Sequence, residues 1–257
     1  MDCLNGQSIC GYEEGSVIIH TMKNILFDLD GTLLPMNEDE FTRYYFGLLC
    51  RKMAPYGLDS KTLVDNIWAG TAKMISNDGS CTNEEAFWRF FTPAMGIDRE
   101  KYEPLFKEFY RDEFNIAIKA TQPTQLAKKV IDACLDKGYD IYLATNPFFP
   151  SEGTLNRIRW AGMDRESFKY VTTYENSSFC KPNLDYYREL MEKFSIDPTE
   201  SMMVGNDVEE DMIASKLGFK TCLITDCLLN RKKLPIEADW QGSLAEFLEF
   251  IKNTDVI

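Results

Sequence analysis

The feature that most constrains the fold of this 257-residue chain is a regular alternation of short apolar runs with longer amphipathic runs, from about residue 121 onward. The apolar runs have the length of β-strands, and the amphipathic runs have helical spacing. The predicted strands are 140–145, 170–173, 201–204 and 220–225, and the predicted helices are 125–137, 155–160, 184–194, 209–217 and 243–251. Such alternation is typical of a parallel sheet with helices on both faces. The sequence therefore predicts an α/β fold with a doubly wound, Rossmann-like parallel sheet.

An additional predicted strand, 23–29, stands far ahead of this region, and the chain between them has only helical periodicity. Its apolar stripes contain Phe41, Tyr44, Tyr45, Leu48, Leu49 and Met53; Leu63, Val64, Ile67 and Trp68; Phe87, Phe90 and Phe91; and Tyr102, Leu105, Phe106, Phe109 and Tyr110. Thr82 and Glu85 have capping-box spacing ahead of the third stripe. Pro104 must lie in the first turn of the fourth helix or kink it. We interpret the aromatic residues as packing within a helical lobe.

This lobe divides the chain. We expect an α/β core formed by residues 22–35 and 121–257, with an all-helical cap inserted over residues 36–120. Residues 1–21 have no sustained periodicity. We interpret them as a flexible N-terminal extension or as residues ahead of a later start at Met22.

The formal net charge is −13, from 28 basic and 41 acidic residues. A surface of that sign repels nucleic acid and anionic lipid. The apolar runs fall short of the roughly 18 residues that cross a bilayer, and no signal core follows a basic start. The eight cysteines include no Cys-x-x-Cys pair, so we interpret them as reduced thiols. We expect a cytoplasmic monomer or homodimer without nucleic-acid or membrane partners.

His20 is the single histidine of the chain. A Ser-His-Asp or Cys-His mechanism would have to use it. It lies ahead of the first predicted strand in a segment without a clear pattern, so a surface role is the simpler interpretation. Acid–base chemistry therefore falls to carboxyl groups.

Polar residues follow the predicted strands where ligands bind in an open parallel sheet, at the carboxyl ends. The ordered set is Asp28 and Asp30, then Thr145 and Asn146, then Lys181 before Pro182, then Asp207 and Asp211. Taken singly, the last two aspartates could cap a helix and the lysine could be solvated. An ordered set at successive strand ends favours a functional site.

Four segments resemble the four motifs of the haloacid dehalogenase-like hydrolase superfamily. They are Asp28-Leu29-Asp30-Gly31-Thr32, Ala144-Thr145-Asn146, Lys181-Pro182 and Gly205-Asn206-Asp207-Val208-Glu209-Glu210-Asp211. The helical insertion resembles the C1-type cap of the phosphatase branch. One departure is Asn206, which stands where many members have glycine directly before the acid.

The resemblance implies a magnesium site and a nucleophile. Asp28 would attack phosphorus and form an aspartyl-phosphate. Mg²⁺ would be bound by the Asp28 carboxylate, the backbone carbonyl of Asp30, Asp207 and water. Asp30 would serve as general acid to the leaving group and then as base for water.

It also implies roles for the other motif residues. Thr145 would hydrogen-bond the transferring phosphoryl group, Asn146 would contact substrate, and Lys181 would neutralise negative charge. Asp211 would hold Lys181 or a metal-bound water. Because the carboxylates outweigh Mg²⁺ and Lys181, and a phosphate dianion adds negative charge, we expect Asp30 to bind a proton more readily than Asp28.

The function predicted from these residues is Mg²⁺-dependent hydrolysis of a small-molecule phosphate monoester. Phosphoglucomutase-like transfer within a sugar phosphate shares every core motif and is the enzymatic alternative. The non-enzymatic alternative is a regulator that binds phosphate without catalysis. Such a protein would not need a second acid, Asp30, beside Asp28. In the dehalogenase branch the residue equivalent to Asp30 is typically not an aspartate, which disfavours carbon–halogen cleavage.

Overall fold

The computed structural model describes residues 22–254, so the predicted extension 1–21 and His20 lie outside the described residues. A six-stranded sheet has the order β3-β2-β1-β4-β5-β6, with every adjacent pair parallel. The strands are β1 Asn24–Phe27, β2 Asp140–Leu143, β3 Tyr170–Val171, β4 Ser201–Gly205, β5 Lys220–Ile224 and β6 Trp240–Gly242. The predicted parallel α/β sheet is therefore confirmed. Strand β6 is short and only partly buried, and it is not among the strands predicted from the sequence.

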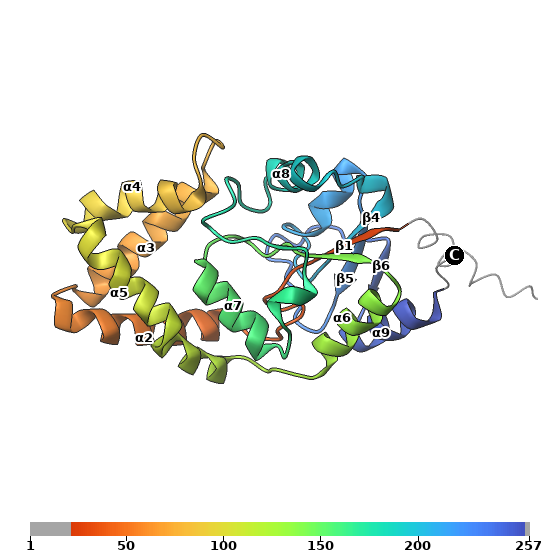
Figure 1. The fold of residues 1–257 in the computed structure, drawn as a ribbon, viewed down its shortest axis with the longest axis horizontal. Helices are drawn as coiled ribbons and strands as arrows, with labels where there is room; N and C mark the ends of the chain where they lie inside the picture. Colours follow the sequence, from red (N-terminus) through yellow and green to blue (C-terminus); the bar gives the residue numbers. More distant parts are fainter. Residues whose placement is uncertain (1–21, 255–257) are drawn as a thin grey trace, which may run out of the picture.

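Both faces of the sheet are covered, as the doubly wound prediction requires (Figure 1). Ile25 and Phe27 of β1 belong to the apolar cluster that contains α6 and α9. Leu26, which points the opposite way in the strand, belongs to the cluster that contains α8. The helices of this part are α6 Leu126–Asp136, α7 Ser151–Trp160, α8 Leu184–Phe194 and α9 Leu244–Asn253, with the short 3₁₀ helices η3 Arg165–Ser167, η4 Pro198–Glu200 and η5 Met212–Leu217.

The residues between β1 and α6 form a helical lobe at one end of the molecule (Figure 1). Its elements are α2 Glu38–Met53, η1 Ala54–Tyr56, α3 Ser60–Ile75, α4 Asn83–Met95, α5 Arg99–Arg111 and η2 Glu113–Ala120. Each α-helix begins at a side-chain N-cap, namely Asn37, Asp59, Thr82 and Asp98. Pro104 lies inside α5, in its second turn. The helical insertion is thus observed, while its division at 35/36 and 120/121 stays a prediction.

The aromatic stripes supply most of the lobe's interior. Phe91, Phe106 and Trp88 are buried and meet edge to face, with ring centroids 5.6–5.7 Å apart. Tyr44 and Trp68 depart from the packing interpretation, because 36% and 53% of their surfaces are exposed.

Two local predictions need correction. The predicted helix 209–217 is a turn followed by η5, so Asp207 and Asp211 do not lie on one face of an α-helix. The Asp207 carboxylate accepts the N–H groups of Glu209 and Glu210, and the Asp211 carboxylate accepts that of Asp207, so these side chains satisfy the N–H groups of a single turn that continues as the tighter 3₁₀ helix η5. Helix α7 begins at Ser151, directly after Pro150, rather than at residue 155. The capping box at Thr82 and Glu85 is confirmed in one half: Thr82 is the N-cap of α4, and its Oγ1 accepts the backbone N–H of Glu85 at 3.3 Å. Both halves of such a box occur at Ser243 and Glu246 at the start of α9.

No helix within residues 22–254 is long and apolar enough to cross a membrane.

Candidate active site

The carboxyl end of β1 carries the first two predicted site residues. The backbone N–H of Asp28 still pairs with the carbonyl of Val204 at 2.9 Å, so this side chain is fixed by the sheet itself. The chain then turns at Gly31, where φ is +85°, a conformation that favours glycine. A Cβ at Gly31 would lie 2.3 Å from the side-chain nitrogen of Asn206. The turn therefore requires glycine both for its conformation and for its close approach to the loop after β4.

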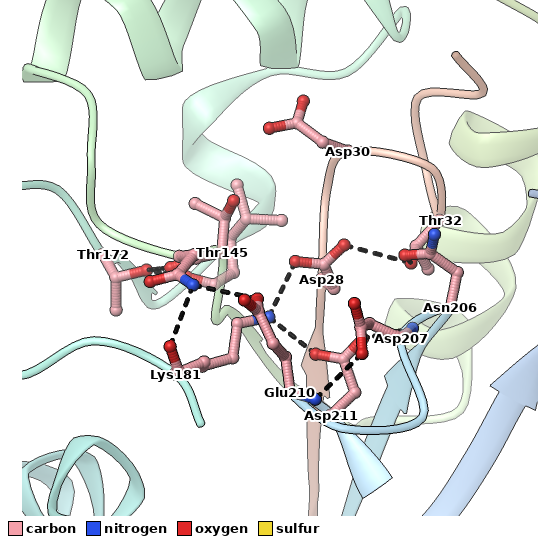
Figure 2. Close-up of polar contacts among 12 residues, drawn as sticks. Asp28, Asp30, Thr32, Thr145, Thr172, Lys181, Asn206, Asp207, Glu210 and Asp211 are labelled. Carbon is pink, nitrogen blue, oxygen red and sulfur yellow. Dashed lines mark hydrogen bonds and ion pairs between the residues drawn. The ribbon is translucent and has the colours of Figure 1, made fainter. Parts of the chain in front are cut away.

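Lys181 joins the loops that follow three strands. Its Nζ lies 2.8 Å from Oδ1 of Asp28 and 2.6 Å from Oδ1 of Asp211, and all three residues are buried (Figure 2). Burial alone would lower the pKa of Lys181, but the carboxylates of Asp211 and Asp28 together raise the pKa well above its ordinary value. Lys181 is therefore a fixed cation beside Asp28. The peptide bond from Lys181 to Pro182 is cis.

The other oxygen of Asp28 faces a hydroxyl. Thr32 Oγ1 lies 3.1 Å from Asp28 Oδ2 and 3.0 Å from Asn206 Oδ1, so its single hydrogen can be donated to either oxygen. Asn206 in turn donates to the carbonyl of Cys227 at 2.7 Å. Asn206, which departs from the common motif, thus connects the loop after β1 with the loop after β5.

Asp211 reaches the site because the chain at Gly205 has no side chain. A Cβ there would lie 2.1 Å from Oδ2 of Asp211. The same oxygen accepts the N–H of Asp207 at 3.0 Å while Oδ1 accepts from Lys181. The structure therefore gives Asp211 the predicted contact with Lys181.

Asn146 and Glu210 form a contact that the sequence did not predict. Asn146 Nδ2 donates to the carbonyl of Lys181 at 3.2 Å and to Glu210 Oε2 at 2.9 Å. Burial raises the pKa of Glu210 to about 8. Thr145 is buried, and its carbonyl accepts hydrogen bonds from Thr172 at 2.6 Å and Tyr186 at 3.0 Å. These bonds fix the backbone of the second motif beside Lys181.

Arg157 of α7 is the second residue that the sequence analysis missed. Its guanidinium, fully buried, forms an ion pair with Oδ2 of Asp30 and lies 4.2 Å from the ring centroid of Phe149. Asp30 Oδ1 is buried and has no hydrogen-bond partner among residues 22–254. Burial raises the pKa of Asp30 to about 6, although Arg157 acts to lower it. In Figure 2 the Asp30 carboxyl group points away from that of Asp28. The two aspartates therefore have different environments.

The only sequence signal for Arg157 is its place between Leu155 and Ile158 on a predicted helix. Arginine on a helix is usually exposed, so this signal does not distinguish a buried arginine from a solvated one.

The carboxylates of Asp28 and Asp207 and the backbone oxygen of Asp30 are the donor types that Mg²⁺ prefers. Within residues 22–254 no group of three or more His, Cys, Asp or Glu side chains could hold a metal ion. A metal here would need backbone or water oxygens in addition to the two carboxylates. Asp207 Oδ1 accepts the N–H groups of Glu209 and Glu210, and Oδ2 lies 3.3 Å from Nη1 of Arg231. The donor set fits a magnesium ion, with Arg231 competing for one oxygen of Asp207.

A cavity of about 360 Å³ lies between the sheet and the helical lobe, and the site residues predicted from the sequence line it together with Glu210 and Arg231. We call its polar part, formed by Asp28, Asp30, Lys181, Asp207 and Asp211, the pocket floor. The opposite side, formed by aromatic side chains of α2 to α5, is the pocket wall. A polar floor beneath an apolar wall is the usual composition of a small-molecule site.

Residues 22–217 match the haloacid dehalogenase-like hydrolase family, and the chain belongs to that family. No curated protein matches its sequence.

Solved structures with this fold include a HAD phosphatase from Thermococcus onnurineus, 20% identical with a TM-score of 0.56, covering 91% of this chain and 100% of that one. The putative HAD-hydrolase YfnB from Bacillus subtilis, bound to magnesium, is 19% identical with a TM-score of 0.53, covering 90% of this chain and 99% of that one. The L-2-haloacid dehalogenase from Xanthobacter autotrophicus is 12% identical with a TM-score of 0.53, covering 91% of this chain and 100% of that one. At these identities the likeness shows the fold alone, and it includes both phosphatases and dehalogenases.

Proposed function

We propose that this chain hydrolyses small-molecule phosphate monoesters with Mg²⁺, through an aspartyl-phosphate on Asp28. The observation that carries the proposal is the arrangement of two carboxyl groups at one pocket floor. Asp28 contacts the fixed cation Lys181, whereas Asp30 is held separately by Arg157. A nucleophile and a separate acid–base group are what a two-step phosphoryl transfer needs.

In the first step an oxygen of Asp28 attacks phosphorus and the bond from phosphorus to the substrate alcohol breaks. Asp30 donates a proton to the departing alcohol oxygen. In the second step Asp30 accepts a proton from water, the water oxygen attacks phosphorus, and the bond to Asp28 breaks to release phosphate. Each step leaves Asp30 in the protonation state that the next one requires.

Fixed positive charge must offset the repulsion between a carboxylate and a phosphate dianion. Lys181 supplies one such charge, and its ion pair with Asp211 keeps it beside Asp28. Mg²⁺ held by Asp28, Asp207 and the Asp30 carbonyl would supply further charge and lower this repulsion. Thr145 and Asn146 stand beside Lys181, where they could contact the phosphoryl group.

Arg157 gives Asp30 a resting partner. A buried carboxylate without a counter-ion would be costly, and Arg157 offsets that cost until substrate arrives. Its stacking on Phe149 links this position to the aromatic residues of the lobe. The presence of Asp30 also favours phosphate-ester hydrolysis over dehalogenation. A departing halide needs no proton, so a dehalogenase would have no use for this general acid.

The test compares Asp30→Asn with the unchanged protein on two phosphate esters, one with a good leaving group and one with a poor one. Activity on the poor leaving group should fall by about 10²–10⁴-fold, and activity on the good one much less. Equal losses on both esters would exclude the acid role. Asp28→Asn should abolish phosphate release from both, and EDTA should do the same until Mg²⁺ is restored.

A further inference from the structure

The pocket wall is built from side chains that carry rings rather than charges. Its lining includes Tyr45 and Phe46 of α2, Trp68 of α3, Phe87 and Trp88 of α4, and Phe106 of α5. Several of these rings also pack against one another, such as Phe46 against Trp68 with centroids 5.5 Å apart. Four helices thus present aromatic faces to the same cavity.

The charges that line the pocket are mostly negative. Among the described residues its lining includes the carboxyl groups of Asp28, Asp30, Glu38, Asp207, Glu210 and Asp211. Its cations are Lys181 and Arg231, both from loops of the sheet domain. Lys181 is already paired with Asp28 and Asp211, and Arg231 with Glu38 and Asp207. A second phosphate or carboxylate on the substrate would therefore find no unpaired cation in the described lining.

Trp68 is the wall residue whose position packing explains least. It lines the cavity, yet 53% of its surface is exposed. An indole ring that lines the cavity and is half exposed can contact a bound group.

We infer that the alcohol part of the substrate is a flat aromatic group without a second anionic group. This inference rests on the proposed phosphatase function and adds the substrate class. The phosphate would lie at the floor, and the ring would lie among the wall aromatics, where stacking and apolar burial favour it. It also favours hydrolysis over a sugar phosphomutase reaction, since a sugar bisphosphate would place a second phosphate against the wall.

The experiment measures phosphate release with Mg²⁺ from primary-alcohol esters of similar leaving-group basicity. They are benzyl phosphate, 4-carboxybenzyl phosphate, glucose 6-phosphate and phosphocholine, with acetyl phosphate as a small substrate that needs no wall contact. We expect kcat/KM for benzyl phosphate to exceed those for glucose 6-phosphate and phosphocholine by about tenfold or more. The kcat/KM for 4-carboxybenzyl phosphate should be about a hundredfold lower than that for benzyl phosphate, because of its added carboxylate. A preference for the carboxylated, sugar or choline ester would overturn the inference.

Variants test the wall directly. Trp68→Ala should lower the ratio of kcat/KM for benzyl phosphate to that for acetyl phosphate by about tenfold, and Trp68→Phe should restore part of it. Tyr56 is 41% exposed and is not part of the described pocket lining, so Tyr56→Ala serves as the matched control and should leave the ratio unchanged. An unchanged ratio in Trp68→Ala would exclude this ring from substrate binding.

Binding separates this inference from the proposed function. Benzylphosphonate, which cannot be hydrolysed, should bind more tightly than 4-carboxybenzylphosphonate by calorimetry whether or not any ester is turned over. Release of phosphate from acetyl phosphate without this difference would overturn the aromatic inference alone. The binding difference without turnover of any ester would overturn the phosphatase proposal and retain the aromatic site.

Discussion

The pocket floor and the pocket wall are held in place by different interactions. Floor residues stand at strand ends and are fixed by ion pairs, such as Lys181 with Asp28 and Asp211, and by glycines that allow close approach. Wall residues stand on helices, and rings such as Trp88 and Phe106 are fixed by packing against more than one other ring. Cores tolerate changes of shape better than paired buried charges tolerate the loss of a partner. We therefore expect floor substitutions to alter chemistry sharply and wall substitutions to alter selectivity gradually.

The largest effect should follow from Lys181→Met. It removes the cation between two buried carboxylates, so we expect phosphatase activity to fall by about 10³-fold and the free energy of unfolding by about 3–5 kcal/mol. Steady-state kinetics and urea unfolding would measure both quantities. The exposed Lys216 provides the control, and Lys216→Met should change neither. If Lys216→Met lost as much activity and stability as Lys181→Met, the effect of Lys181→Met could not be assigned to its place in the pocket floor.

Arg157→Gln should produce the next largest effect. Because Arg157 lowers the pKa of Asp30 against the effect of burial, its loss should raise that pKa and move the alkaline limb of the kcat/KM profile, which reports protonated Asp30, to higher pH. The maximal rate should fall by about 10- to 100-fold, because the carboxyl group of Asp30 is no longer held in position. Arg157→Lys should restore part of both. A lower rate with an unmoved pH profile would mean that Arg157 acts only in packing against Phe149.

A smaller change is expected for Glu210→Gln, and it concerns stability. Burial raises the pKa of Glu210 from 4.5 to about 8. The folded protein therefore keeps this proton over a range in which the unfolded chain has released it. The stability that comes from the protonated carboxyl group of Glu210 is fully present below about pH 4.5 and is lost as the pH rises through about 8.

Glu210→Gln should consequently be more stable than the unchanged protein by about 2 kcal/mol at pH 8, with little difference at pH 4. Urea unfolding in EDTA at both pH values measures this. The exposed Glu192 of α8 provides the control, and Glu192→Gln should leave the free energy of unfolding unchanged at both pH values. An equal effect of Glu210→Gln at pH 4 and pH 8 would contradict burial of the Glu210 carboxylate as the cause.

The smallest effect lies on the lobe side. Gly47 is inside α2, and a Cβ there would meet no atom of the described part of the chain within 4 Å. Gly47→Ala should raise the free energy of unfolding by about 0.5–1 kcal/mol and leave catalysis unchanged. Thermal unfolding and kinetics together check both parts. A lower stability would show that this helix face has a neighbour in the full chain.

The sequence predicted those parts of the site that follow from topology. A parallel sheet brings its carboxyl ends to one edge, so Asp28, Lys181 and Asp211 could be expected to meet before their distances were known. The residues that escaped prediction reach the site from helix and loop faces. Arg157 and Glu210 are charged residues in positions where a solvated surface is the usual outcome, and only tertiary packing buries Arg157 fully and Glu210 in part.

The same distinction explains the errors in local structure. In the turn before η5 the side chains of Asp207 and Asp211 accept backbone N–H groups, and helical periodicity does not report such bonds. Helical spacing also predicted the aromatic stripes of the lobe without revealing which rings face the cavity. Trp68 lines the pocket and Tyr44 does not belong to its described lining, although both lie on predicted stripes.

The chain leaves and re-enters the sheet domain at one place. Met36 and Thr121 form an antiparallel bridge, and the N–H of Gln122 donates to the carbonyl of Pro35 at 2.8 Å. The helices between them are therefore, topologically, one long loop with joined ends. The entropy of closing such a loop changes only slowly with its length. A lobe of another size could replace this one between Pro35 and Gln122 without shifting the register of β1, which would let selectivity be exchanged as a cassette while the chemistry stays in place.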